Sequence, residues 1–288
     1  MAARKTLSAA FKQLGFKEFP FSTSADPRFL YLATQHQIVL EKLESLIEAH
    51  QGLCVVDGNI GVGKSSEARR LYDILTGDPD TAYLVVHIPT AVYRTSQDVL
   101  ADIATKLGVP PGRSQRKLLD NYEKALTKMR AAGKTPVIIL DDAQLMRPAC
   151  LEAFQYLYNF DIKDKLLQVI MFGQNPELGV LLGQNSGLMS RIVSWQTILP
   201  LDYPEAVSML NFRCAVAGRS DSLLEESAFA RLYEFSEGIP RTMVIVCGDL
   251  VLAMAEAGRR TAATADVEDA IARYEQRYHA AEPVEAAV

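Results

Sequence analysis

The sequence predicts an α/β fold in which helices cover both faces of a parallel sheet, followed by a helical C-terminal domain. Three observations lead to this prediction. Short strands that are apolar throughout alternate with amphipathic helices between residues 53 and 172, a pattern typical of parallel sheets buried on both faces. A glycine-rich loop joins the first of these strands to its helix. Beyond about Leu201 only helical periodicity remains.

The composition is that of an ordinary globular protein. Of 288 residues, 49% are hydrophobic and 23% are charged, and the net charge is −5, which argues against a protein coated in positive charge. The four cysteines lie far apart without a C-x-x-C pair, so we expect buried thiols in a reducing compartment. Lys12 interrupts the first apolar stretch, and the apolar run 243–257 contains Asp249 and is shorter than a membrane span. We therefore expect a cytoplasmic protein with no membrane contact.

Residues 1–32 form the first predicted region, an extended aromatic segment. Its aromatic residues are Phe11, Phe16, Phe19, Phe21, Phe29 and Tyr31. We expect them to pack across a domain surface; the alternative is that they form one wall of an adenine pocket. A helix is predicted from Thr34, and it ends before Gly52.

The glycine-rich loop fits the pattern G-x-x-x-x-G-K-[ST] and lies between the apolar run 53–56 and a helical segment, 67–75. Its candidate nucleotide-binding residues are Gly58, Asn59, Ile60, Gly61, Val62, Gly63, Lys64, Ser65 and Ser66. Such a loop turns its backbone N–H groups toward an anion, and the helix N-terminus adds partial positive charge. Lys64 would reach the β- and γ-phosphates and the Ser65 hydroxyl would ligate Mg²⁺. The sequence therefore predicts binding of ATP with Mg²⁺.

Acidic and amide side chains follow two later strands. The apolar run 136–140 ends in Asp141-Asp142, at the sheet edge where ligands bind in open α/β folds. Asp141 would share the Mg²⁺ with Ser65, and Asp142 would orient the attacking water as general base. The run 167–172 is followed by Gln174 and Asn175; we favour Asn175 as the polar group near the γ-phosphate, with Gln174 as the alternative.

The remaining elements are helices. Helices are predicted over 95–107, with Thr95 and Asp98 at its start, and over 114–132. Four more are expected near 203–217, 225–236, 240–257 and 264–277. The predicted domains are the aromatic segment 1–32, an α/β core 33–200, a helical lid 201–278 and a disordered tail 279–288.

Several motifs resemble those of one family. They are Phe19-Pro20-Phe21, Asp26-Pro27-Arg28-Phe29-Leu30-Tyr31, Gly58–Ser65, Asp141-Asp142-Ala143-Gln144, Gly173-Gln174-Asn175-Pro176-Glu177-Leu178, Ser190-Arg191-Ile192 and Gly238-Ile239-Pro240-Arg241. With them the chain resembles an AAA+ ATPase of the ExeA-like group, related to the transposition regulators TnsC, TniB and MuB and to origin-recognition initiators. The resemblance extends from about Gly15 to Arg273.

The resemblance implies a P-loop NTPase core with five parallel strands and a C-terminal helical lid. It also implies that Arg191 is an arginine finger acting on the neighbouring subunit, and that Arg241 is a second sensor reaching the nucleotide from the lid. Head-to-tail assembly into a ring or a helical filament follows from a trans-acting arginine. The family usually has Asp-Glu where this chain has Asp141-Asp142; the shorter side chain predicts slow or partner-dependent hydrolysis.

The sequence leaves two biological roles open, one that involves DNA and one that does not, and the local charge of one segment distinguishes them. Between Arg94 and Lys134 there are nine Lys/Arg against four Asp/Glu, a local net of +5, and such a cluster can neutralise phosphates. The candidate contacts with duplex DNA are Arg94, Arg113, Arg116 and Lys117. We favour a DNA-associated ATP switch, such as a regulator of transposition target selection with a transposase or other effector as partner. The alternative is an ATPase that drives or regulates assembly of a protein complex. A small-molecule kinase is disfavoured because no acceptor site is evident.

Overall fold

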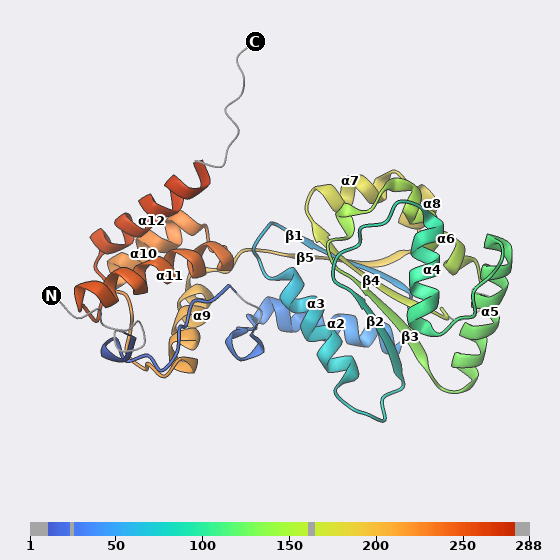
Figure 1. Ribbon diagram of the computed structural model, residues 1–288, viewed down its shortest axis with the longest axis horizontal. Coiled ribbons are helices and arrows are strands. Elements are labelled where there is room, and N and C mark those ends of the chain that lie inside the picture. The colour runs from blue at the N-terminus through green and yellow to red at the C-terminus, as the bar shows by residue number, and fades with distance from the viewer. Residues whose placement is uncertain (1–10, 24–25, 161–164, 280–288) are drawn as a thin grey trace, which may run out of the picture. The chain divides into compact units, whose positions relative to one another are not determined.

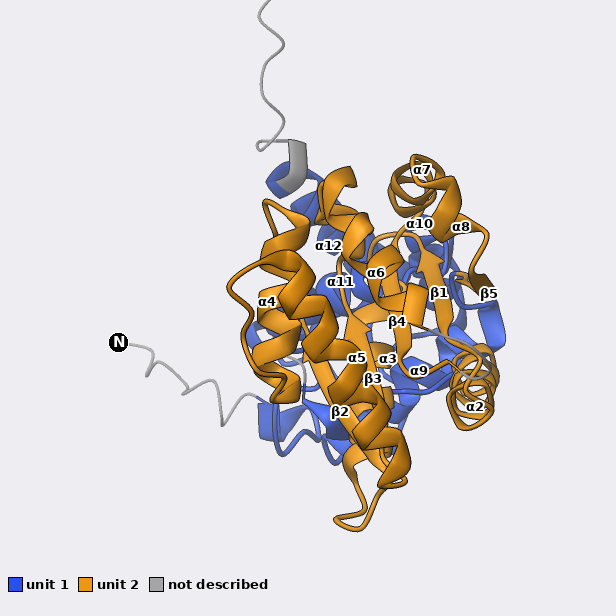
Figure 2. Cartoon of the chain, turned by 90° about the vertical axis from the view of Figure 1, so that its right-hand side faces the viewer, with its two compact units in different colours: residues 1–33, 200–288 blue, residues 34–199 orange. Residues whose placement is uncertain are grey.

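The computed structural model describes residues 11–23, 26–160 and 165–279. The chain divides into two compact units (Figures 1 and 2). Unit 2 is continuous, from Thr34 to Leu199, and unit 1 combines the N-terminal segment up to Ala33 with everything from Pro200 onward. Apart from His279, the predicted disordered tail lies outside the described residues.

Unit 2 contains the predicted five-stranded parallel sheet, in the order β2-β3-β4-β1-β5. Its strands are β1 Leu53–Gly58, β2 Tyr83–Ile88, β3 Thr135–Leu140, β4 Gln168–Gln174 and β5 Ile192–Ile198. Since all strands run in the same direction, the ends of β1, β3 and β4 lie at one edge of the sheet. This edge gathers the phosphate loop and the two polar strand ends identified from the sequence.

Helices cover both faces of this sheet (Figure 1). Alternate strand residues such as Leu53 and Val55 join a core formed with α4–α8, whereas α3 contacts the strands from the other face, beside α2. These helices are α2 Thr34–Glu48, α3 Lys64–Thr76, α4 Ser96–Leu107, α5 Gln115–Ala131, α6 Leu151–Leu157, α7 Glu177–Gly183 and α8 Ser186–Met189. Short 3₁₀ turns are η1 Pro27–Phe29, η2 Ala143–Leu145, η3 Pro148–Cys150 and η4 Tyr158–Phe160.

Local capping fixes the bounds of α4 and α5. Thr95 and Asp98 form a reciprocal capping box at the start of α4, and Gly108 ends that helix in the left-handed conformation. Ser114 caps α5 by accepting a hydrogen bond from the Lys117 N–H. These caps confirm both predicted helices to within a residue or two.

Unit 1 is a helical bundle of α9 Tyr203–Val216, α10 Glu226–Ser236, α11 Pro240–Ala257 and α12 Thr264–His279. Its most buried helix is α11, whose apolar side chains fill the core of the unit. No helix within the described ranges is long and apolar enough to cross a bilayer. The apolar run 243–257 lies in α11, and most of its apolar side chains belong to the core of unit 1.

The N-terminal aromatic segment belongs to unit 1, where Phe16, Phe21 and Phe29 are buried in the helical core. The role of these three rings is thus packing. Two arginines fasten the segment to the bundle. Arg213 donates hydrogen bonds to the carbonyl oxygens of Pro20, Ser22 and Phe29.

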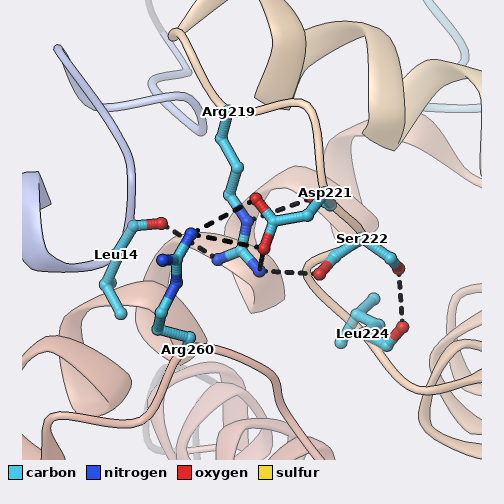
Figure 3. Close-up of polar contacts among 6 residues, drawn as sticks. All are labelled: Leu14, Arg219, Asp221, Ser222, Leu224 and Arg260. Carbon is cyan, nitrogen blue, oxygen red and sulfur yellow. Dashed lines mark hydrogen bonds and ion pairs between the residues drawn. The ribbon is translucent and has the colours of Figure 1, made fainter.

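The second arginine, Arg219, has a fully buried side chain (Figure 3). It donates to the carbonyl oxygens of Leu14, Asp221 and Ser222, and it forms an ion pair with the Asp221 carboxylate. Arg260 Nη2 also lies 3.5 Å from the Asp221 carboxylate. A buried guanidinium is tolerated when its donors are satisfied, and here the acceptors come from the N-terminal segment and the loop after α9.

Candidate nucleotide-binding site

The phosphate loop lies between β1 and α3, as predicted, and its glycines are required by geometry. Gly61 and Gly63 have φ values of 86° and 115°, a region that favours glycine. A Cβ on Gly58 would lie only 2.5 Å from the Ile198 carbonyl oxygen. The loop can therefore pass close to β5 only because residue 58 has no side chain.

The Lys64 ammonium group lies over this loop. Its Nζ donates to the carbonyl oxygens of Gly58, at 2.9 Å, and Asn59, at 2.7 Å, and the residue is only 9% exposed. The first turn of α3 thus presents a partly buried positive charge beside the backbone N–H groups of the loop. This is the electrostatic environment that an oligophosphate requires.

Ser65 and Asp141 meet at the end of β3. The Ser65 hydroxyl lies beside the Asp141 carboxyl, which accepts the Asp142 N–H at 2.9 Å. Burial raises the pKa of Asp141, and the Ser65 hydroxyl and the Asp142 N–H oppose that rise. A hydroxyl and a carboxylate are hard oxygen donors that fit Mg²⁺, which takes its other ligands from phosphates and water.

Asp142 is held next to this pair in a left-handed conformation, with φ 50° and ψ 40°. Its Oδ1 accepts a hydrogen bond from Gln144 Nε2 at 3.1 Å, and Gln144 Oε1 accepts the Gln174 N–H at 3.0 Å. Gln144, identified from the sequence only as part of a motif, thus links the acidic strand end to β4. Non-glycine residues in this conformation cluster at functional sites.

The two candidates for the first sensor differ in their surroundings. The Asn175 N–H donates to the Gly58 carbonyl oxygen at 3.1 Å, so Asn175 lies beside the first glycine of the loop. The Gln174 side chain instead donates to Glu177 at 3.3 Å. The choice of Asn175 stays a prediction.

Arg191 lies at the opposite edge of the sheet from the loop. It precedes β5, in which Ile192 pairs with Leu53 while Ile198 pairs with Gly58. Six residues of strand separate these ends, a distance of roughly 20 Å at ~3.3 Å per residue. Its guanidinium donates to the Gln155 carbonyl oxygen at 3.0 Å and to Asn159 Oδ1 at 2.7 Å. Arg191 is therefore remote from the phosphate loop of its own unit.

The other predicted residues lie elsewhere. Arg241 is in the first turn of α11, so neither unit by itself contains both Arg241 and the phosphate loop. Arg94 and Arg113 lie in loops, and Arg116 and Lys117 lie in the first turn of α5; all four are exposed.

Two buried residues behind the loop were not predicted: His36 on α2 and Glu67 on α3. His36 is 6% exposed and Glu67 1%, and His36 Nε2 lies 3.2 Å from the Val62 carbonyl oxygen and 3.9 Å from Glu67 Oε2. The sequence contains a signal for the burial of Glu67: this residue precedes Leu71 and Leu75 at intervals of four, and all three lie on the buried face of α3.

Glu67 is an expensive group to bury. Neither of its carboxyl oxygens accepts a hydrogen bond from the residues described, and burial raises the pKa of this carboxyl to about 8. We expect Glu67→Met to raise the free energy of unfolding by about 1–3 kcal/mol at pH 8, because methionine has a similar length and no polar group to desolvate.

The gain in the free energy of unfolding from Glu67→Met should become smaller as the pH is lowered. A carboxyl whose pKa is higher in the folded state favours folding most below its unfolded pKa of 4.5, and this contribution is lost as the pH rises toward 8. Urea denaturation of the nucleotide-free, Mg²⁺-free protein at pH 5 and pH 8 measures both effects. The exposed Glu41→Met is the matched control, and an equal gain there would contradict the explanation.

The sheet order, the phosphate loop and the acidic strand end together give the AAA P-loop NTPase fold. Residues 47–182 match the family described as "AAA domain". The fold predicted from the sequence for the α/β core and its phosphate loop is thereby confirmed.

Among characterised proteins, the chain is 31% identical over 266 residues to general secretion pathway protein A of Aeromonas hydrophila. The match takes in 91% of this chain and 47% of the relative, so the chain spans about half the relative's length. Among solved structures, Cdc6p of Pyrobaculum aerophilum superimposes with a TM-score of 0.66 at 20% identity, covering 92% of this chain and 74% of that one. The ORC1 protein of Aeropyrum pernix, in complex with DNA, gives 0.60 at 15% identity, covering 88% and 70%.

Proposed function

We propose that this chain is an ATPase that binds ATP with Mg²⁺ at the phosphate loop and hydrolyses it. The observation that carries the proposal is the meeting of Ser65 and Asp141 beside Lys64. Together they offer a metal-binding oxygen pair and a positive charge at one edge of the sheet. Such a constellation suits phosphoryl transfer, in which positioning and electrostatics supply most of the catalysis.

Each residue then has a distinct role. Lys64 and the loop N–H groups hold the β- and γ-phosphates, and Ser65 and Asp141 hold Mg²⁺, which neutralises charge on the phosphate oxygens. Asp142 accepts a proton from the water whose oxygen bonds to the γ-phosphorus, while the bond to the β–γ bridging oxygen breaks. Asn175 orients that water or the γ-phosphate. Arg241 is the second sensor, as the family resemblance implies.

A second copy of the chain completes the site in this proposal. Arg191 is remote from its own loop, across the length of β5, and so its charge is available to a neighbour that binds that edge. Head-to-tail contacts of this kind repeat, which gives a ring or a helical filament.

For the biological role we favour a cytoplasmic, DNA-associated ATP switch, such as a regulator of transposition target selection acting with a transposase or other effector. The basic segment supports this role. Its residues Arg113, Arg116, Lys117, Lys124 and Lys128 are exposed, whereas Lys106 pairs with Asp102 and Lys134 donates to the Thr81 carbonyl oxygen. The similarity in fold to the ORC1 protein of Aeropyrum pernix, solved in complex with DNA, points the same way.

The second candidate role is an ATPase that drives or regulates assembly of a protein complex. The observation that favours it is the 31% identity to general secretion pathway protein A. In that case the basic segment is a solvated helix face.

Charge reversal of the basic segment tests the choice. The variant Arg113→Glu, Arg116→Glu, Lys117→Glu should still bind ATP but lose duplex DNA at low salt. DNA binding by the parent protein with a non-hydrolysable ATP analogue should be largely independent of sequence and should weaken steeply with salt, because counterion release supplies most of it. Fluorescence anisotropy with a labelled duplex measures this.

The matched control reverses three exposed basic residues on the α2–α3 side, as Lys42→Glu, Arg69→Glu, Arg70→Glu. It carries the same change in net charge and should retain most of the DNA binding. If the assembled parent shows no salt-sensitive DNA binding, the switch fails and the role in protein-complex assembly takes its place.

A further inference from the structure

The back of the phosphate loop is occupied by a buried histidine. His36 lies near the start of α2, and its Nε2 is 3.2 Å from the Val62 carbonyl oxygen. A carbonyl oxygen only accepts hydrogen bonds, so in this contact Nε2 carries the proton and donates it. The ring also packs against the next residue: a Cβ on Gly63 would lie 3.3 Å from Nε2.

This contact constrains one peptide of the loop. In a planar trans peptide the C=O group and the following N–H group point in opposite directions. With the Val62 carbonyl turned toward His36 on α2, the Gly63 N–H must point away from α2. Gly63 is also the residue with φ 115° that joins the loop to α3, and without a side chain its peptide would otherwise be free to rotate.

We propose that His36 is a positioning residue for the phosphate loop, which holds the Val62–Gly63 peptide so that the Gly63 N–H faces the phosphates. This inference rests on the proposed function, because it assigns a role within the same nucleotide site. His36 touches no phosphate in this role and acts only through the orientation of a backbone donor.

Glu67 lies next to the imidazole. Its side chain is fully buried in the first turn of α3, and Oε2 lies 3.9 Å from the same His36 Nε2. The imidazole is thus in contact with the loop and close to α3, and its side chain is only 8% exposed. Pre-organisation of this kind strengthens binding because the loop does not have to be ordered when the ligand arrives.

Two substitutions separate hydrogen bonding from packing. His36→Phe keeps an aromatic ring in the cavity but has no donor, whereas His36→Gln has an amide nitrogen at a reach similar to Nε2. We expect His36→Phe to weaken ATP and ADP binding by about 10- to 100-fold. This is the range for losing one hydrogen bond to a charged group, here the bond from the Gly63 N–H to a phosphate. His36→Gln should recover most of that loss. The exposed Ile38→Ala on the same helix should have no effect.

Isothermal titration calorimetry with ATP and with ADP, in the presence of Mg²⁺, measures the affinities, and thermal unfolding without nucleotide checks the fold. If His36→Phe does not fold, the smaller His36→Leu replaces it in the comparison with His36→Gln. Parent-like affinity in the donor-less variant, or equal losses in the donor-less and glutamine variants, would overturn the inference. A parent protein that does not bind ATP would instead overturn the proposed function.

Discussion

Lys64→Ala should weaken ATP binding by more than 100-fold while the protein stays folded. The Lys64 ammonium lies over the loop on the Gly58 and Asn59 carbonyl oxygens, and the residue is only 9% exposed. Charge-assisted hydrogen bonds to phosphate are about twice as strong as neutral ones, and a site with low exposure screens them weakly. Calorimetric titration with Mg²⁺ and ATP measures the loss.

Two controls make this result specific. Lys64→Met keeps the apolar stem and should lose ATP binding as fully as Lys64→Ala, which shows that charge is responsible. Lys42→Ala removes an exposed lysine from α2 and should bind ATP like the parent. Unchanged ATP affinity in a folded Lys64 variant would refute the assignment of the phosphate loop.

Arg191→Ala should leave ATP binding by a single subunit intact but reduce turnover by a factor of roughly 10³ or more, the lower end of the effect of an arginine finger. The reason is geometric, since Arg191 lies at the opposite end of β5 from the loop of its own unit. Loss of turnover should be accompanied by loss of ATP-dependent assembly. Phosphate release and analytical ultracentrifugation measure the two.

Asn159→Ala is the matched control for this variant. It removes the hydrogen bond between Arg191 and Asn159 within the chain but leaves the guanidinium available, so turnover should persist. Mixing Arg191→Ala with Lys64→Ala should restore part of the activity, because hybrid interfaces pair an intact loop with an intact arginine. A protein that stays monomeric at full turnover would disprove the role in trans.

The sequence predicted the parts of the fold that have strong local patterns. Strands β1, β3 and β4 are buried along nearly their whole length, so their apolar runs are unmistakable. Strand β5 was implied by the family resemblance alone, and no pattern located it. It is an outermost strand of the sheet and contains Ser194, Gln196 and Thr197. Neither an apolar run nor a clean alternation of apolar and polar residues therefore marks it in the sequence.

The site shows a similar division. Residues that belong to motifs could be placed because their spacing is tied to the strand ends. His36 and Glu67 could not, because their contact joins the start of α2 to the start of α3 across 31 positions of sequence. Helical spacing places Glu67 on the buried face of α3, but only the packed structure shows that both residues lie together behind the loop.

The arginine ties of unit 1 also bear on how the chain is made. Arg213 and Arg219 donate hydrogen bonds to the carbonyl oxygens of Leu14, Pro20, Ser22 and Phe29 from positions 184 to 205 residues further on. A ribosome adds roughly 5–20 residues per second, so the aromatic segment emerges on the order of ten seconds or more before these partners. Throughout that interval Phe16, Phe21 and Phe29 lack the bundle that buries them, and the whole of unit 2 is synthesised before the first helix of that bundle. During synthesis the burial of these three rings therefore has to wait for the last helices of the chain.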